Sequence, residues 1–480
     1  YKTEILNNRV DSSIANSSPY HKEYSKVINS VNGKMEHGRN PNEVADLVLK
    51  IIKQKNPKIN YLVGGFLEKK ITLKSLFPDK FFQKITMTNS SLTKTIQESQ
   101  SMMNDQKIDG WLLYDYRGMN PILWDTIGHI PHVTRPCWFW IPQTGSPEII
   151  CSYVDQNRFE QLDFKTNFWV SRNEMIGILK KILQTSKKIA MEYSPLVSLP
   201  RISKVDAGTI ELIKSLGVDV ISSADLVQFS TQRWDEKDLN SHLKAADILT
   251  STVKSAFDFI GSNINSNPYE FEIAEYIRDM FKSNNLYSPD GPVVAANYHS
   301  ADPHFEPTKE SSNKIFEGDW ILIDLWGCLE ESQGMYADIT WTAYVGDKIP
   351  EKNQSVFSAV TGGRDQAVEM MKKSHSDGEI LQGWQLDKIA RDYISSCGYG
   401  KYFSHRLGHS LGREVHSNAV NLDGWETHDT RSFIPQIAVT VEPGVYLPKE
   451  FGVRSEIDIF YYPEGPEVTT EIQTEPYIIR

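Results

Sequence analysis

Residues 320–326 read WILIDLW, an apolar run interrupted by a single carboxylate, Asp324. A run of this length and composition predicts a strand that is buried on both faces. An ionised carboxylate inside such a strand costs free energy unless it is paired or holds a metal ion. We therefore expect Asp324 to have a partner of opposite charge.

In each of three later segments, strand alternation places an acid on the face opposite apolar side chains. The segments are YADITWTAYVG (336–346), IAVTVEPG (437–444) and FGVRSEIDIF (451–460). The charged side chains on those faces are Asp338, Glu442, Arg454, Glu456 and Asp458. The alternative is that these faces are the solvated sides of ordinary antiparallel strands. Asp324 is not explained in that way because its strand has no polar face.

Three of the chain's 12 histidines lie within HRLGHSLGREVH, residues 405–416. The spacing of His405 and His409 fits one face of a helix, but Gly408 and Gly412 disfavour a helix, so we predict a loop or strand. The zinc-protease motif HExxH is excluded because no Glu follows His405. Four carboxylates and an imidazole are a hard, oxygen-rich ligand set that suits Mn, Co, Fe or Zn, particularly as a bridged pair.

The composition is that of a soluble globular protein with two or more domains. At 480 residues the chain exceeds one ordinary core. Its net charge of −11 disfavours nucleic acid or an anionic membrane as the main partner. No apolar run is long enough to span a bilayer. The 4 cysteines lack metal-type spacing, which indicates reduced thiols and a cytoplasmic location.

Periodicity divides the chain into three segments. Residues 1–90 begin polar and then show a helical pattern. Residues 91–232 alternate short apolar runs with helical stretches, which predicts an α/β domain. Residues 233–480 open with helical spacing in HLKAADILTSTVKSAFDFIG (242–261) and continue with the strands and histidines described above.

The acidic and histidine motifs together resemble metallopeptidase family M24, the pita-bread group of Xaa-Pro aminopeptidase, prolidase and creatinase. IDLWG, ADITWT, GHSLGREVH, VTVEPGVYLP and FGVRSEIDIF occur in the order of that family. The resemblance covers about residues 91–480. It implies an α+β protein, with a creatinase-like α/β N-terminal domain at 91–232 and a pita-bread catalytic domain at 233–480.

The resemblance also implies two divalent metal ions, with Mn expected and Co, Zn or Fe as alternatives. Asp338 and Glu456 would bridge the two ions, Asp324 would hold one, and His409 and Glu442 would hold the other. A hydroxide shared by the two cations would attack the scissile carbonyl, because such cations lower the pKa of water toward ~7.

The remaining polar residues gain roles in the same way. His304, in SADPHFEPT, and His416 would contact the substrate as catalytic residues, and Glu442 would also carry a proton to the leaving nitrogen. His405 would line the pocket for the residue after the scissile bond, and Arg454 would pair with the metal-site carboxylates. The implied substrate is a short peptide with proline after the scissile bond, and the implied assembly is a homodimer.

Two departures from the family pattern indicate a divergent branch. The gap LWGCLEESQGMYA between the two aspartates is longer than expected, and ETHDTR (426–431) adds His428 and acids without an assigned role. The alternatives are a hydrolase of a small-molecule amide at the same site and an inactive, peptide-binding pseudo-peptidase. Creatine hydrolysis is disfavoured because creatinase lacks the metal ligands, and methionine aminopeptidase because it lacks so large an N-terminal domain.

Residues 1–90 resemble the C-terminal tail of a short-chain dehydrogenase, over the stretch from NPNEVADLV to FFQKI. Neither a Gly-rich dinucleotide loop nor a Tyr-x-x-x-Lys pair is present, so this chain is not expected to be an oxidoreductase. The alternative is an unrelated N-terminal extension. Because the chain begins with Tyr1 rather than Met, the tail interpretation predicts a dehydrogenase encoded upstream.

Overall fold

The computed structural model describes residues 89–329 and 334–480. Ser91–Arg480 form one compact unit that combines helices with β-sheets. This mixture matches the predicted α+β class. The predictions for residues 1–88 lie outside the described residues.

A six-stranded sheet forms the N-terminal part of this unit, in the order β4-β3-β2-β1-β5-β6. Its strands are β1 (Gly110–Asp115), β2 (Cys137–Pro142), β3 (Glu148–Ser152), β4 (Lys165–Trp169), β5 (Lys188–Met191) and β6 (Asp219–Ser222). The short apolar runs predicted in this region all form strands. Strand β4 is not predicted by the sequence because most of its side chains are exposed or half-buried, so it lacks an apolar signature.

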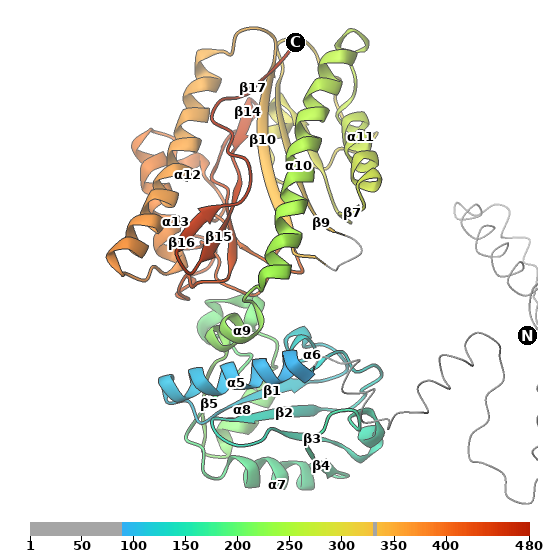
Figure 1. Cartoon of the computed structure of the whole chain (residues 1–480), viewed down its shortest axis with the longest axis vertical. Helices are drawn as coiled ribbons and strands as arrows, with labels where there is room; N and C mark the ends of the chain where they lie inside the picture. The colour runs from blue at the N-terminus through green and yellow to red at the C-terminus, as the bar shows by residue number, and fades with distance from the viewer. Residues whose placement is uncertain (1–88, 330–333) are drawn as a thin grey trace, which may run out of the picture. The chain divides into compact units, whose positions relative to one another are not determined.

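Helices cover both faces of this sheet (Figure 1). They are α5 (Asn89–Gln106), α6 (Pro121–Ile127), α7 (Arg172–Leu183), α8 (Ala207–Ser215) and α9 (Ala224–Thr231). Alternation along β1 divides the core in two: Trp111 and Leu113 pack with α5, α6 and α9, whereas Leu112 and Tyr114 pack with α7 and α8.

The second part of the unit begins with the predicted long helix, α10 (Glu236–Asn263), which starts at a capping box of Asp235 and Asp238. Its apolar face packs on β9 (Trp320–Leu329) and β10 (Ala337–Val345) (Figure 1). These antiparallel strands form the centre of a sheet in the order β17-β10-β9-β7, and β8 also pairs with β9. The surrounding elements are α11 (Glu270–Ser283), β7 (Leu286–Tyr287), β8 (Val293–Ala296) and β17 (Tyr477–Ile479).

A four-stranded sheet, β11-β12-β15-β16, and the hairpin β13-β14 complete this part, and two helices, α12 and α13, cover them (Figure 1). The elements are α12 (Glu351–Asp377), α13 (Gly383–Ser396), β11 (Ser410–Leu411), β12 (Ala438–Val441), β13 (Gly444–Leu447), β14 (Phe451–Arg454), β15 (Ile457–Tyr462) and β16 (Gly465–Val468). Strand β15 contacts β10, so the two sheets meet there.

The prediction of one continuous strand through FGVRSEIDIF is wrong. The segment forms β14 and β15, with Ser455 and Glu456 between them. The chain passes from the hairpin to the four-stranded sheet at this point, and the Glu456 N–H donates to the carbonyl of Thr340 on β10 at 3.2 Å. Asp458 is therefore not beside Arg454 at the cavity; it is fully buried, and its Oδ2 accepts the Asp338 N–H at 2.9 Å.

Among the described helices, none combines the length and apolar composition needed to cross a membrane. The four cysteines are free thiols, as predicted; Cys137, Cys151 and Cys328 are buried and Cys397 is exposed.

Candidate metal centre and active site

All residues given a role from the sequence line one cavity of about 840 Å³. They are His304, Asp324, Asp338, His405, His409, His416, Glu442, Arg454 and Glu456. The fold thus brings together side chains from segments that are far apart along the chain.

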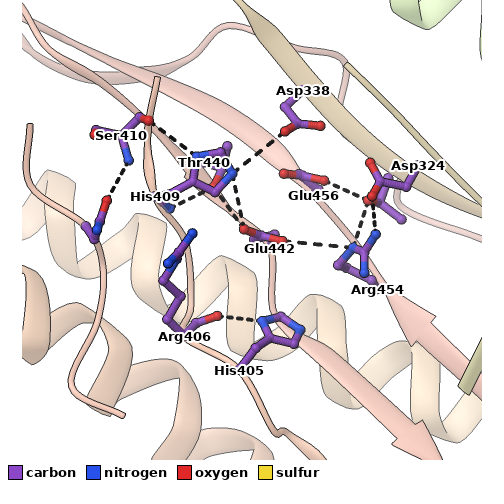
Figure 2. Close-up of polar contacts among 12 residues, drawn as sticks. Asp324, Asp338, His405, Arg406, His409, Ser410, Thr440, Glu442, Arg454 and Glu456 are labelled. Carbon is purple, nitrogen blue, oxygen red and sulfur yellow. Dashed lines mark hydrogen bonds and ion pairs between the residues drawn. The ribbon is translucent and has the colours of Figure 1, made fainter. Parts of the chain in front are cut away.

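Strands β9 and β10 supply the two aspartates (Figure 2). The register places Asp324 opposite Thr340, and Asp338 lies two residues before Thr340 on the same face of β10, as strand alternation predicts. The neighbouring residues Ile323 and Ile339 point the other way, into the core that α10 covers. The buried strand therefore presents Asp324 to the cavity, where its side chain is 14% exposed.

A tight loop, not a helix, places His409 among the acids, as predicted. Gly408 lies so close to β12 that a Cβ atom at this position would be 2.1 Å from the carbonyl oxygen of Thr440. The His409 N–H donates to Thr440 Oγ1 at 3.0 Å, and the Thr440 N–H donates to the His409 carbonyl at 2.8 Å. The imidazole Nε2 then lies 3.5 Å from Glu442 Oε1 and 3.7 Å from Asp338 Oδ2.

Arg454 lies beside Asp324 on the other side of the centre (Figure 2), where it and Thr340 hold the carboxylates. Thr340 Oγ1 donates to Glu456 Oε2 at 2.7 Å and accepts from Arg454 Nε at 3.0 Å. The Arg454 guanidinium also forms an ion pair with Asp324 and donates to the Tyr446 hydroxyl at 3.1 Å. Asp324 thus has the cationic partner that its buried strand requires.

The centre still contains more buried negative charge than the protein neutralises. Burial and the nearby carboxylates of Glu456 and Asp324 raise the pKa of Asp338 well above its usual value. Burial, then repulsion from Glu442 and Asp324, raises the pKa of Glu456 in the same way. Burial also raises the pKa of Glu442 to about 7. Asp324 Oδ1 and Asp338 Oδ1 are buried without a hydrogen-bond partner.

These residues fit a divalent metal ion. Asp338, His409 and Glu456 each offer a ligand atom, and the three atoms lie within 4.8 Å of one another. Burial and the neighbouring His416 hold the pKa of His409 well below its usual value, so its ring is neutral and free to coordinate. Unpaired carboxylate oxygens beside a neutral imidazole form the donor set that Mn, Fe, Co and Zn accept.

His416 and His304 lie on the cavity side of this cluster. The His416 ring centroid is 4.3 Å from that of His409. Burial lowers the pKa of His416 to about 4, so its ring is neutral near pH 7. His304 is exposed to the cavity, and its backbone N–H donates to Asp302 Oδ1 at 3.0 Å.

His405 is held in one orientation by two hydrogen bonds. Its Nδ1 lies 2.7 Å from the carbonyl oxygen of Arg406, and its Nε2 lies 2.8 Å from the hydroxyl of Tyr446. Because a carbonyl can only accept, Nδ1 carries the proton and Nε2 accepts from Tyr446. Burial, reinforced by Arg454, lowers the pKa of His405 to about 3.

Several charged residues of the cavity are not identified by the sequence analysis. They are Asp290, Glu306, Arg406 and Glu426. Asp290 and Glu306 lie in irregular segments without a periodic signal. Arg406 could have been identified, because it is a charged residue between two histidines in HRLGHSLG, where most of the other intervening positions are Leu or Gly.

The ETHDTR segment, which had no predicted role, divides into two parts. Glu426 reaches the cavity, and its Oε1 accepts the Arg406 N–H at 3.0 Å. Asp429 and Arg431 are buried and form an ion pair at 2.7 Å, and His428 packs on Trp384 with ring centroids 5.3 Å apart. The segment therefore places the acid Glu426 at the cavity, and its buried Asp429–Arg431 ion pair and the packing of His428 fix it to the rest of the fold.

Residues 241–461 match the family model described as metallopeptidase family M24. The chain is 29% identical over 328 residues to an Xaa-Pro dipeptidase of Pyrococcus horikoshii, which covers 67% of this chain and 84% of that one. It is 27% identical over 327 residues to an Xaa-Pro dipeptidase of Pyrococcus furiosus, with 67% and 85% covered.

Solved structures of similar proteins share the fold of this chain. The prolidase from Pyrococcus horikoshii superposes with a TM-score of 0.55 at 25% identity, covering 79% of this chain and 99% of that one. A dipeptidase from Mycobacterium ulcerans has a TM-score of 0.64 at 19% identity, covering 82% and 99%, a likeness that shows the fold alone. The predicted α+β fold class, with a creatinase-like α/β part followed by a pita-bread part, is confirmed; the domain boundaries stay predictions.

Proposed function

We propose that this metallopeptidase, whose residues 241–461 belong to family M24, cleaves short peptides at the bond that precedes proline. One observation carries the proposal: four carboxylates and an imidazole converge on a single cavity, and two of their buried carboxylate oxygens have no protein partner. The Xaa-Pro dipeptidases among the relatives support proline as the residue after the bond.

The predicted ligands would hold two divalent cations, with Mn expected. Asp338 and Glu456 would be shared by both ions, Asp324 would hold one ion, and His409 and Glu442 the other. When bound, such cations act as Lewis acids and lower the pKa of water toward ~7, which supplies a nucleophile at neutral pH.

The chain's own residues would position the substrate and move the proton. Glu442 faces the cavity, and one of its carboxylate oxygens would accept a proton from the attacking water and pass it to the leaving nitrogen. The nitrogen of an Xaa-Pro bond has no N–H and leaves as a secondary amine, so it needs that proton. His416, neutral and beside the metal ligand His409, would donate a hydrogen bond to the substrate carbonyl as negative charge develops there. His304 would contact the peptide from the exposed side of the cavity.

A pseudo-peptidase that merely binds peptides is the weaker interpretation, because every predicted ligand faces the cavity. Hydrolysis of a small-molecule amide at the same site is the alternative that the substrate panel below tests. The homodimer, the cytoplasmic location and the preference for Mn stay predictions.

The experiment combines metal content with hydrolysis. Purified chain is stripped, reloaded with Mn, Co or Zn, and assayed against Xaa-Pro dipeptides, tripeptides and matched peptides without proline. We expect two ions per chain and metal-dependent cleavage before proline. Two ions without peptide cleavage would move the search to other amides, and no uptake would contradict the proposal.

His409 and His416 provide a matched pair of variants, because their rings are adjacent. His409→Ala is expected to lose metal and activity together. His416→Ala is expected to keep two ions and lose turnover. Loss of metal in His416→Ala would contradict the division of roles between the two imidazoles.

A further inference from the structure

Glu270, the first residue of α11, is fully buried and is not one of the residues that line the cavity. Its Oε1 accepts the Ala296 N–H at 2.6 Å, and its Oε2 accepts the Asn313 N–H at 2.6 Å. Both oxygens also lie 2.9 Å from His299 Nδ1, which donates because an ionised carboxylate can only accept. One carboxylate therefore joins the two ends of the segment 296–313 and orients an imidazole inside it.

The segment between these two ends carries His304, which the proposed function places against the peptide. The turn around His304 is shaped locally, because the N–H groups of His304 and Phe305 donate to Asp302 at 3.0 and 3.1 Å. These hydrogen bonds fix the shape of the turn but not its place in the fold. Another contact has to attach the turn to the rest of the molecule.

Phe305 supplies that contact. Its ring is buried, lines the cavity, and stacks on the His299 ring with centroids 4.0 Å apart and an interplanar angle of 19°. Tyr298 contacts the same imidazole edge-on at 4.4 Å, and its hydroxyl accepts a hydrogen bond from Asn313 Nδ2 at 2.9 Å. The imidazole is therefore held by a hydrogen bond and a second ring, and the turn rests on it through Phe305.

We propose, on the basis of the proposed function, that His299, oriented by Glu270, is a positioning residue that sets the place of His304 in the cavity. The contacts lead from the buried carboxylate to the imidazole, and from the imidazole to Phe305, the residue next to His304. His299 does not line the cavity, so it acts only through the turn. A shift of about 1 Å in a group that contacts the substrate can lower turnover about a hundredfold.

The competing interpretation is that Glu270 and His299 only stabilise the fold. A purely stabilising contact changes the fraction of folded protein but leaves the rate constants of the folded enzyme as they are. A positioning contact lowers kcat/KM of the folded enzyme, and it does so only while His304 is present. A double-mutant cycle with His304 separates the two interpretations.

The test uses metal-loaded wild type, His299→Gln, His304→Ala and the double variant, on the Xaa-Pro peptide that wild type cleaves best. The glutamine amide still offers Glu270 an N–H donor but has no ring to stack on Phe305. We expect His299→Gln to keep the metal content and to lower kcat/KM about ten- to a hundredfold, divided between kcat and KM as in His304→Ala. The double variant should equal His304→Ala, because no imidazole is left to be positioned.

His375→Gln is the matched control. The His375 Nδ1 lies 3.0 Å from the Tyr461 hydroxyl and its ring contacts that of Tyr461, but His375 does not line the cavity. The control is expected to keep the kcat/KM of wild type. Wild-type kcat/KM in His299→Gln would overturn the proposal, and so would a loss that multiplies with that of His304→Ala.

Hydrogen exchange of the metal-loaded chain separates this proposal from the proposed function. If wild type cleaves no Xaa-Pro peptide, the proposed function fails. The His299 proposal is then decided by the backbone amides of residues 302–307. Faster exchange of these amides in His299→Gln than in wild type and His375→Gln, with residues 320–329 unchanged, supports it. Equal exchange in all three proteins would overturn it.

Discussion

Two clusters of buried acid in this chain differ in how their charge is satisfied. Glu192, just after β5, is fully buried and lies among protein donors. It accepts from Trp111 Nε1 at 2.6 Å, Asn120 Nδ2 at 2.9 Å, the Tyr114 N–H at 3.3 Å and Ser223 Oγ at 3.3 Å. Burial raises the pKa of Glu192 to about 7, although these donors act to lower it.

The cluster around Asp338 has the opposite balance. Asp338 is close to further acids rather than to side-chain donors, and its Oδ1 has no hydrogen-bond partner. Asp324 pairs with the cation Arg454, whose Nε also lies 4.0 Å from Glu442 Oε2, and Glu456 accepts from the hydroxyl of Thr340. A buried acid that the protein supplies with donors is complete as a structural element. Buried acids that are crowded together with unpaired oxygens need a cation or protons from solution.

The largest expected effect is that of Asp338→Asn on hydrolysis. The amide would remove a charged group that the proposed function makes a ligand of both metal ions, so we expect activity to fall about a thousandfold or more, since metal catalysis supplies several kcal/mol. The measurement is steady-state hydrolysis together with metal content.

Asp392→Asn is the control, because Asp392 pairs with Lys388 on the exposed surface of α13. The control should match wild type. Full activity in Asp338→Asn would show that the acids near β10 are structural, as Glu192 is.

The second effect is on stability and concerns Glu192. Glu192→Ala leaves Trp111 Nε1 buried without an acceptor and leaves Asn120 Nδ2 with only the Tyr114 carbonyl, so we expect the free energy of unfolding to fall by roughly 2 to 4 kcal/mol. The activity of the folded fraction should stay at the wild-type level. Urea unfolding measures the free energy of unfolding, and an assay at low denaturant measures the activity of the folded fraction.

Glu471→Ala is the matched control, because Glu471 pairs with Lys254 where both side chains are exposed. A surface pair of this kind contributes about 1 kcal/mol or less. If the two variants are equally stable, the hydrogen bonds to Glu192 do not make it a structural acid, and the contrast between the clusters is lost.

The same contrast explains how much the sequence could predict. Asp324 and Asp338 are visible because apolar runs surround them, and the α10 stripe is visible because its period is helical. Local patterns of this kind predict the helices and strands, but they do not predict which of these elements contact one another. The complete ligand set, including His409 and Glu456, came from the resemblance to a known family and not from periodicity.

What the sequence missed depends on contacts between distant segments. Glu192 looks like the solvated end of a short strand, because its main donors, Trp111 and Asn120, are 81 and 72 residues away. The break at Ser455 is also invisible locally, because alternation continues through it while the chain changes sheets. Arg406 is conspicuous in the sequence, but its ion pair with Glu426 and its unpaired Nε are properties of the folded cavity.

The smallest expected effect is a pH dependence of the metal-free chain. Below pH 7 two trends oppose each other. Histidines whose folded pKa is lowered, such as His416 at about 4, stabilise the fold as pH rises toward their unfolded value. Glu192 and Glu442, with folded pKa values raised to about 7, destabilise it over the same range. Above pH 7 the histidines are neutral in both states, so that opposition ends.

Above the usual carboxyl pKa, Asp338 and Glu456 add to the effect of Glu192 and Glu442, because their pKa values are also raised in the folded state. The folded state binds more protons there than the unfolded state, so stability falls as pH rises. One to two such protons correspond to a fall in melting temperature of roughly 2 to 3 °C per pH unit for a unit of this size. Bound cations would hold these carboxyls deprotonated, so the slope should shrink in metal-loaded protein to the part that Glu192 contributes, and it should also shrink in metal-free Asp338→Asn. The same slope with and without metal, measured by calorimetry, would show that the crowded acids are not the ones that the cations neutralise.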